Sequence, residues 1–345
     1  MSTQVQEMTR TIAALTAPSK GILAADESSG TIEKRLKAVN VSCTEQTRRD
    51  YREVLFSTPG LSEFISGVIL FEETLKQKTA AGVALPQLLT AQGIVVGIKV
   101  DKGTAPLPGF PGEKITQGLD GLAQRLDEYK ELGARFAKWR AVISLGTGIP
   151  TPQTIATNAQ ALARYAALCQ ERGLVPIVEP EVLMDGDHTL ASCARVTEEV
   201  LHAVFHALYR QRVSLEYILL KPNMVVPGAT HPEQAAPEQV AQATLATLRR
   251  MVPAAVPGIY FLSGGQGDVA ATANLNAMNA RPENHPWVLS FSYGRALQAP
   301  TLEAWRGESA NKMIAQQALY RCASLNSAAR EGKYTAAMEI ERAAT

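Results

Sequence analysis

Lys221 is the residue whose position most clearly suggests covalent chemistry. It follows a mainly apolar run, residues 215–220, and precedes Pro222. The run is short enough to be a buried strand, which Pro222 should end because proline lacks the N–H group that a central strand needs. Burial favours the neutral amine of a lysine, and the neutral amine attacks carbonyl carbons. A lone lysine at a strand end more often extends into solvent, so the residues at the other strand ends decide between these interpretations.

Charged or hydroxyl side chains also stand at the ends of most other short apolar runs. Residues i and i+2 of a strand share a face, so paired residues at one strand end should point the same way. Positive charges near Lys221 would favour its neutral form, while Glu179 and Asp26 could transfer protons. Arg140 and Asp101 fit a structural ion pair and a role in the site equally well. The residues at the run ends are Asp26, Lys99, Asp101, Lys138, Arg140, Glu179, Glu181, Lys221, Ser263 and Arg295.

Two further groups of residues have the composition of phosphate sites. Ser263, Gly264 and Gly265 follow the seventh run, Gly294 and Arg295 follow the eighth, and glycine lets backbone N–H groups approach an anion closely. The second group follows the first run, so two anions at opposite ends of one substrate are plausible. A simple turn and ordinary solvated helix charges are the alternative interpretations. The second group consists of Ser28, Ser29, Thr31, Lys34 and Arg35.

Eight short apolar runs alternate with segments of helical periodicity along the chain. This alternation, without a break in composition, predicts a single α/β domain, a (β/α)8 TIM barrel with catalytic residues at the C-terminal ends of its strands. An open doubly wound sheet is the alternative, but no run is followed by a GxGxxG motif. We expect residues 1–335 to form the barrel and residues 336–345 a short tail. The runs are residues 21–25, 65–71, 94–100, 136–143, 175–178, 218–220, 259–262 and 288–291.

Composition limits the classes of partner. The chain has 34 Lys and Arg against 33 Asp and Glu, so no overall field favours nucleic acid or an anionic membrane. No apolar segment is long enough to cross a bilayer, and residues 1–20 lack the core of a signal peptide, which predicts a cytoplasmic protein. The four scattered cysteines are expected to be free thiols. His202 and His206 have the i, i+4 spacing of some metal ligands, but no third ligand is evident.

Taken together, the motifs at the strand ends resemble those of the class I, Schiff-base, fructose-1,6-bisphosphate aldolases. The resemblance extends from about residue 20 to residue 335, and the order of the motifs makes it very specific. The motifs are GILAADES (21–28), GIKVDKG (97–103), FAKWR (136–140), VEPE (178–181), LLKPNM (219–224), LSGGQ (262–266) and FSYGRAL (291–297).

The resemblance implies a TIM-barrel lyase, usually a homotetramer. It would cleave fructose 1,6-bisphosphate reversibly to dihydroxyacetone phosphate and glyceraldehyde 3-phosphate, in glycolysis and gluconeogenesis, without a metal or other cofactor. Lys221 would form the imine, Glu179 would be the general acid and base, and Asp26 and Lys138 would assist. The substrate-binding residues would be Ser263, Gly264, Gly265, Ser292, Gly294 and Arg295 at the C1 phosphate, Ser28, Thr31, Arg35 and Lys99 near the C6 phosphate, and Arg140.

The chain departs from the family pattern in two places. Tyr217 and Ile218 stand where the family usually has glycine and threonine, on the catalytic strand. The tail is short and has no terminal tyrosine, which predicts a lower ratio of activity on fructose 1,6-bisphosphate to activity on fructose 1-phosphate than in relatives with longer tails. Steady-state assays on both sugars test that ratio.

Two other classes of function remain as alternatives. A scaffold would bind a sugar bisphosphate without cleaving it, but the intact set of Asp26, Lys138, Glu179 and Lys221 argues against that function. A metal-dependent aldolase is disfavoured because no set of histidines stands at the strand ends, and activity that survives EDTA would argue against it further.

Overall fold

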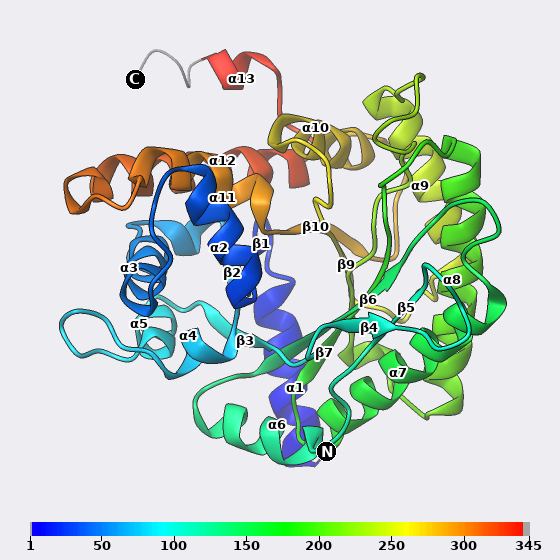
Figure 1. Ribbon diagram of the computed structural model, residues 1–345, viewed down its shortest axis with the longest axis horizontal. Helices are drawn as coiled ribbons and strands as arrows, with labels where there is room; N and C mark the ends of the chain where they lie inside the picture. The colour runs from blue at the N-terminus through cyan, green and yellow to red at the C-terminus, as the bar shows by residue number, and fades with distance from the viewer. Residues whose placement is uncertain (1, 341–345) are drawn as a thin grey trace.

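The (β/α)8 barrel predicted from the sequence is present in the computed structural model, which describes residues 2–340 (Figure 1). Its strands are β1 (Gly21–Ala25), β2 (Ile65–Leu70), β3 (Val95–Lys99), β6 (Phe136–Ile143), β7 (Val175–Val182), β8 (Leu219–Leu220), β9 (Gly258–Phe261) and β10 (Val288–Tyr293). They pair in this order, all in parallel, and β10 pairs with β1 to close the sheet. Consecutive barrel strands are therefore spatial neighbours, and their carboxyl ends meet at one mouth.

Helices surround the barrel on the outside (Figure 1). Two of the helices begin at proline, at Pro152 and Pro237, and Thr151 accepts a hydrogen bond from the Thr154 N–H as an N-cap. The helices are α1 (Thr3–Leu15), α2 (Ser29–Ala38), α3 (Glu45–Phe56), α4 (Glu72–Lys76), α5 (Leu85–Thr90), α6 (Leu122–Glu131), α7 (Pro152–Glu171), α8 (Leu190–Arg210), α9 (Pro237–Met251), α10 (Asp268–Asn279), α11 (Arg295–Trp305), α12 (Lys312–Arg330) and α13 (Ala337–Ile340).

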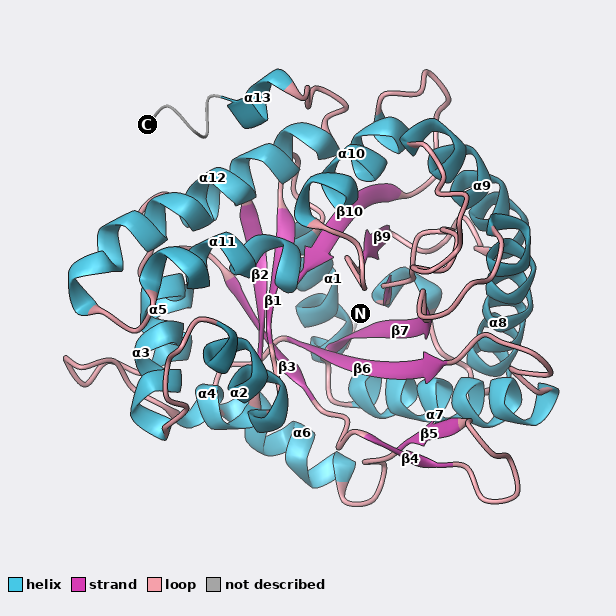
Figure 2. Ribbon diagram, turned by 45° about the horizontal axis from the view of Figure 1, so that its top comes forward, coloured by secondary structure: helices cyan, strands magenta, loops and turns pink. Residues whose placement is uncertain are grey.

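Apolar side chains fill the interior of the barrel at the amino ends of the strands. Helix α1 lies across this end and is seen behind the strands in Figure 2. Its Leu15 carbonyl accepts hydrogen bonds from the Ser66 hydroxyl (2.9 Å) and the Tyr260 hydroxyl (2.6 Å). A Cβ on Gly97 would lie 2.3 Å from the ring of Phe136, so the ring needs the space that glycine leaves. The cluster consists of Met8, Leu15, Ile22, Ala24, Ile69, Phe136, Val175, Ile177, Leu219 and Tyr260.

The segment that leads to Lys221 differs from its predicted form. A strand was expected from residue 215 onward, but Leu215–Tyr217 forms a 3-10 turn and only Leu219–Leu220 joins the sheet. The side chain of Tyr217 is half-buried and packs against the apolar cluster at the amino end, while Ile218 is fully buried in the core. The two unusual residues thus pack on the amino side of the short strand, before the chain reaches the barrel mouth.

The proline- and glycine-rich segment after β3 is the turn of a small β-hairpin. Strand β4 (Thr104–Pro106) pairs with β5 (Lys114–Thr116) in a two-stranded antiparallel sheet. Gly109 and Gly112 have φ values of +83° and +82°, a region that glycine adopts without strain, and they let the chain reverse between the strands.

Further predictions from the sequence concern the cysteines, two histidines and the C-terminal tail. All four cysteines are free thiols, as predicted, and His202 and His206 are exposed on α8. Within residues 2–340, no cluster of three or more His, Cys, Asp or Glu side chains is arranged to hold a metal ion. No helix in the same range has the length and apolarity needed to span a membrane. The predicted tail begins with α13, and its residues 341–345 lie outside the described part; the boundary at residue 335 stays a prediction.

Candidate active site

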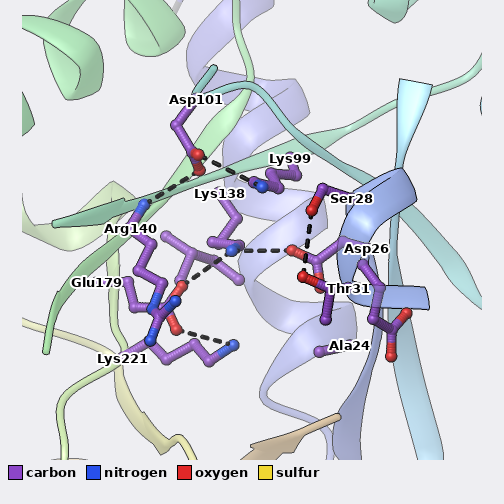
Figure 3. Close-up of polar contacts among 12 residues, drawn as sticks. Ala24, Asp26, Ser28, Thr31, Lys99, Asp101, Lys138, Arg140, Glu179 and Lys221 are labelled. Carbon is purple, nitrogen blue, oxygen red and sulfur yellow. Dashed lines mark hydrogen bonds and ion pairs between the residues drawn. The ribbon is translucent and has the colours of Figure 1, made fainter. Parts of the chain in front are cut away.

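Four side chains of alternating charge meet inside the barrel at the carboxyl ends of its strands (Figure 3). The ammonium nitrogen of Lys138 lies 2.8 Å from Asp26 Oδ2 and 3.2 Å from Glu179 Oε2. The other carboxylate oxygen of Glu179 lies 3.2 Å from Lys221 Nζ. The side chains of Lys138, Glu179 and Lys221 are 4 to 5% exposed. Each buried charge therefore has an opposite charge in contact, which is the condition under which burial is tolerated.

Barrel closure brings these residues together from distant parts of the chain. Asp26 follows β1 and Lys138 lies in β6, and β2 and β3 separate these two strands around the barrel, so the contact crosses the interior. Lys138 and Glu179 lie on the adjacent strands β6 and β7, and both point inward. The backbone N–H of Lys221 donates to the Val178 carbonyl (2.8 Å), which sets Lys221 beside Glu179.

The charges of the site are set by a balance of burial and mutual attraction. Burial alone would raise the pKa of Asp26, but attraction from Lys138 and Lys221 outweighs it and holds the pKa well below the usual range. The same balance lowers the pKa of Glu179. Burial opposes the charged form of Lys138, yet Asp26 and Glu179 raise its pKa. At neutral pH the two acids are carboxylates that can accept protons, and Lys138 is a cation that can donate a hydrogen bond.

A second set of charges lines the barrel mouth next to the first. Asp101 lies 3.5 Å from the ammonium of Lys99 and accepts a hydrogen bond from the backbone N–H of Arg140 (3.4 Å). The guanidinium of Arg140 pairs with Glu181. The sequence left open an ion pair between Arg140 and Asp101; the structure gives each of these side chains a different partner. The side chains of Lys99 and Arg140 thereby lie beside the central four residues.

The loops after β9 and β10 form one rim of the mouth. Arg295 donates a hydrogen bond to the Gly264 carbonyl (2.6 Å), so its guanidinium joins the two loops. Ser292 is buried, and its hydroxyl has no hydrogen-bond partner among the described residues. Gly264 has φ +53°, and a Cβ on Gly265 would lie 2.7 Å from the Met184 sulfur. A cation, an unpartnered hydroxyl and tightly packed glycines are features of an anion site.

The second predicted phosphate group, which follows the first strand, lies at the N-cap and within α2. Ser28 is the N-cap residue of this helix, but its hydroxyl contacts the hydroxyl of Thr31 (3.2 Å) instead of capping the backbone. Ser29 and Lys34 are exposed, whereas Arg35 turns back and pairs with Glu27. Ser28 and Thr31 therefore lie together at a helix N-terminus, and Lys34 lies apart from them on the solvent face.

Sequence reasoning did not select Glu27, although it directly follows Asp26. The side chain is 5% exposed and is bound by Arg35, Arg52 and Gln298. A glutamate beside a predicted catalytic aspartate, within a resemblance motif, was the available signal. Arg52 and Gln298 gave no comparable signal because they come from α3 and α11, which only the folded barrel brings to β1.

Comparisons with known proteins agree with this arrangement. The sequence matches the family described as fructose-bisphosphate aldolase class-I over residues 7–345. The fructose-bisphosphate aldolase of Dictyostelium discoideum is 56% identical over 332 residues, covering 95% of this chain and 93% of that protein. Fructose-bisphosphate aldolase 5, cytosolic, of Arabidopsis thaliana is 54% identical over 340 residues, covering 98% of this chain and 94% of the plant protein.

A solved structure also matches this fold nearly throughout. It is the fructose-bisphosphate aldolase of Plasmodium falciparum, crystallised in complex with TRAP and a small molecule inhibitor. The two chains superpose with a TM-score of 0.95 at 50% sequence identity, and the match covers 97% of each chain. The fold is thus shared across almost the whole length.

Proposed function

Because the chain belongs to the class I fructose-bisphosphate aldolase family, we propose that Lys221, Glu179, Asp26 and Lys138 carry out aldol cleavage through a Schiff base. The protein is a lyase that cleaves fructose 1,6-bisphosphate reversibly to dihydroxyacetone phosphate and glyceraldehyde 3-phosphate. The observation that carries the residue assignment is the 3.2 Å contact between Lys221 Nζ and the Glu179 carboxylate. It places a potential nucleophile against a potential proton acceptor in a buried site.

In the first half of the proposed reaction, Lys221 forms an imine with the C2 carbonyl of the open-chain sugar. Glu179 accepts a proton from the ammonium, and the free amine adds to C2 to give a carbinolamine. Loss of the ammonium charge removes one of the attractions that keep Glu179 ionised, so burial then favours its protonated form. The protonated Glu179 can return that proton to the C2 hydroxyl, which leaves as water and gives the iminium.

In the second half, the iminium accepts the electron pair of the C3–C4 bond. Glu179 removes the proton of the C4 hydroxyl, the bond breaks, and glyceraldehyde 3-phosphate leaves with an enamine remaining on Lys221. Protonation of the enamine at C3 and addition of water at C2 release dihydroxyacetone phosphate and regenerate the amine. Lys138 and Asp26 keep the Glu179 carboxylate oriented, because the ammonium of Lys138 bridges the two acids.

The same proposal assigns the two phosphates to two regions of the barrel mouth and needs no metal. The loops after β9 and β10 would hold the C1 phosphate with Ser263, Ser292 and Arg295, and the start of α2 with Lys99 would hold the C6 phosphate. Electrophilic activation comes from the iminium, so activity should survive EDTA. A loss of activity in EDTA that added metal restores would contradict this part of the proposal.

The decisive experiment is reduction with borohydride in the presence of dihydroxyacetone phosphate, followed by peptide mass mapping. We expect loss of activity and the adduct mass on the peptide that contains Lys221. A Lys221→Met variant should take up no adduct under the same conditions. Modification of another lysine would overturn the assignment, and unmodified protein that still binds sugar bisphosphate would favour the scaffold function.

A homotetramer in the cytoplasm is a further part of the proposal. Its support is the family resemblance and the cytosolic name of the Arabidopsis relative. Light scattering during size-exclusion chromatography should give four times the chain mass, and cell fractionation should recover the protein with cytosolic markers. A monomer at working concentration, or recovery in another fraction, would contradict the respective part.

A further inference from the structure

One buried carboxylate connects both regions of the mouth that carry candidate phosphate ligands. Glu27 accepts hydrogen bonds from Arg52 Nη2 (2.6 Å), from the Gln298 amide (2.8 Å) and from Arg35. Gln298 also donates to the Ala24 carbonyl at the end of β1 (2.7 Å). Since Arg35 lies in α2, Arg52 in α3 and Gln298 in α11, Glu27 ties three helices to β1, and these elements lie together in Figure 1.

The members of this cluster differ in their access to a ligand. The side chains of Glu27 and Arg52 are 5% and 3% exposed, whereas that of Arg35 is 27% exposed. Two arginines share one carboxylate, so the cluster has one positive charge in excess, and Arg35 is the member that can present it. Arg52 and Gln298 bind each other as well (3.2 Å), so Arg52 holds Oε2 of Glu27 while the Gln298 amide shares Oε1 with Arg35.

The guanidinium of Arg35 is anchored through one nitrogen only. Nη1 donates to Glu27, and Nη2 has no hydrogen bond to the described residues. Nη2 instead lies 3.9 Å from the position that a Cβ on Gly294 would occupy. Gly294 lies between Ser292, near the end of β10, and Arg295, the first residue of α11, so this nitrogen faces the rim formed after β9 and β10.

We propose that Glu27 is a positioning residue that orients Arg35 toward the phosphate of dihydroxyacetone phosphate, beside Ser292 and Gly294, and not toward the C6 phosphate near which the family resemblance places Arg35. The planar guanidinium suits this task, because one edge can bind a carboxylate while another nitrogen donates to a phosphate. Arg52 and Gln298 act indirectly by fixing Glu27. The inference rests on the proposed function, since it takes the rim of Ser263, Ser292 and Arg295 as the C1 phosphate site.

The test uses the condensation direction, in which the two phosphates arrive on separate substrates. In Glu27→Gln the guanidinium of Arg35 loses its charged anchor, and we expect KM for dihydroxyacetone phosphate to rise roughly 10- to 100-fold, the value of one charge-assisted hydrogen bond. KM for glyceraldehyde 3-phosphate should stay unchanged. In an Arg35→Ala background, Glu27→Gln should add nothing further, because the residue it positions is gone.

Two further variants separate positioning from folding. Glu33→Gln removes the same charge from an exposed position of α2 and should leave both KM values unchanged. If Glu27→Gln does not fold, Arg35→Lys is the second variant. It keeps Glu27 and the positive charge, but its single ammonium nitrogen cannot bind Glu27 and a phosphate through two nitrogens, as a guanidinium can. It should raise KM for dihydroxyacetone phosphate about 10-fold.

The outcomes distinguish this inference from the proposed function. Unchanged KM for dihydroxyacetone phosphate in folded Glu27→Gln or in Arg35→Lys would overturn the inference, as would a rise confined to glyceraldehyde 3-phosphate. Borohydride trapping at saturating dihydroxyacetone phosphate should still modify Lys221 in Glu27→Gln, at a higher half-saturating concentration. Failure to trap Lys221 in the protein without substitutions would refute the imine assignment, whatever the KM values show.

Discussion

The two halves of the barrel interior are equally buried but chemically opposite. On the same face of β6, Phe136 is 0% exposed and Lys138, two residues later, is 4% exposed. Phe136 is held by shape, since its ring occupies the space left by Gly97. Lys138 is held by charge, between Asp26 and Glu179. Burial therefore does not by itself determine residue type here; the amino half requires complementary volumes and the carboxyl half requires complementary charges.

Lys221→Met is expected to have the largest effect on the carboxyl half. The substitution removes the proposed nucleophile and should lower kcat for cleavage by roughly 10⁵-fold, as loss of a nucleophile does in other covalent enzymes. The matched control is Lys34→Met, at an exposed position of α2. Stopped assays with excess enzyme would measure both. A Lys221→Met variant with more than a few per cent of normal turnover would refute covalent catalysis at this residue.

Glu179→Gln should have the next largest effect. It keeps the shape of the side chain but removes the proton acceptor beside Lys221, so kcat should fall by about 10² to 10⁴-fold. Glu181→Gln is the matched control two residues along the same strand, since Glu181 pairs with Arg140 and not with either of the two buried lysines. Steady-state kinetics on both variants tests the difference. Equal losses of kcat would mean that general charge, rather than proton transfer at Glu179, limits the reaction.

Phe136→Ala tests the amino half of the barrel. Removing a buried aromatic ring beside Gly97 leaves a cavity, and the free energy of unfolding should fall by about 3 to 5 kcal/mol. Activity per folded molecule should change little, because the charged set lies nearer the carboxyl ends. Thermal and denaturant unfolding measure the first effect, and assays normalised to folded protein measure the second. A large loss of kcat with normal stability would show that the two halves are not separable.

The smallest expected effect is on the pH dependence of stability. The folded pKa values of Asp26 and Glu179 lie below their ordinary values of 3.8 and 4.5. Their contribution to stability is therefore complete above about pH 5 and is lost as pH falls toward the lower folded values. Asp26→Asn removes one of the two contributions, so its Tm should decline less steeply with acidification than that of the exposed control Asp120→Asn. Identical slopes would mean that Asp26 does not carry this dependence.

Sequence reasoning identified the eight strands and the residues at their ends because both depend on local pattern. Apolar runs and segments of helical periodicity are visible along the chain, and a barrel places every strand end at one mouth. The partner of each charge was not predictable in the same way. Lys138 contacts Asp26 across the barrel interior, and Glu27 contacts Arg52 of α3. The first contact depends on closure of the barrel, and the second on how α3 packs against it.

The run before Lys221 shows a second kind of limit. Its apolar composition fits a strand, yet residues 215–217 form a 3-10 turn in which Tyr217 packs against the apolar cluster at the amino ends of the strands. Periodicity cannot separate these outcomes in so short a segment. The residues that matter chemically were unaffected, because Pro222 and the short strand fix Lys221 in either case.

The hydrogen bond between the Leu15 carbonyl and the Tyr260 hydroxyl spans 245 positions of sequence. Helix α1 is synthesised long before Tyr260, to which it is bonded, and β1 gains its second neighbour only when β10 emerges. Such long-range closure slows folding and leaves apolar surface exposed in the meantime. During synthesis the nascent chain therefore exposes the apolar faces of α1 and β1 until β10 closes the barrel, and chaperones that recognise apolar surface have that interval in which to bind.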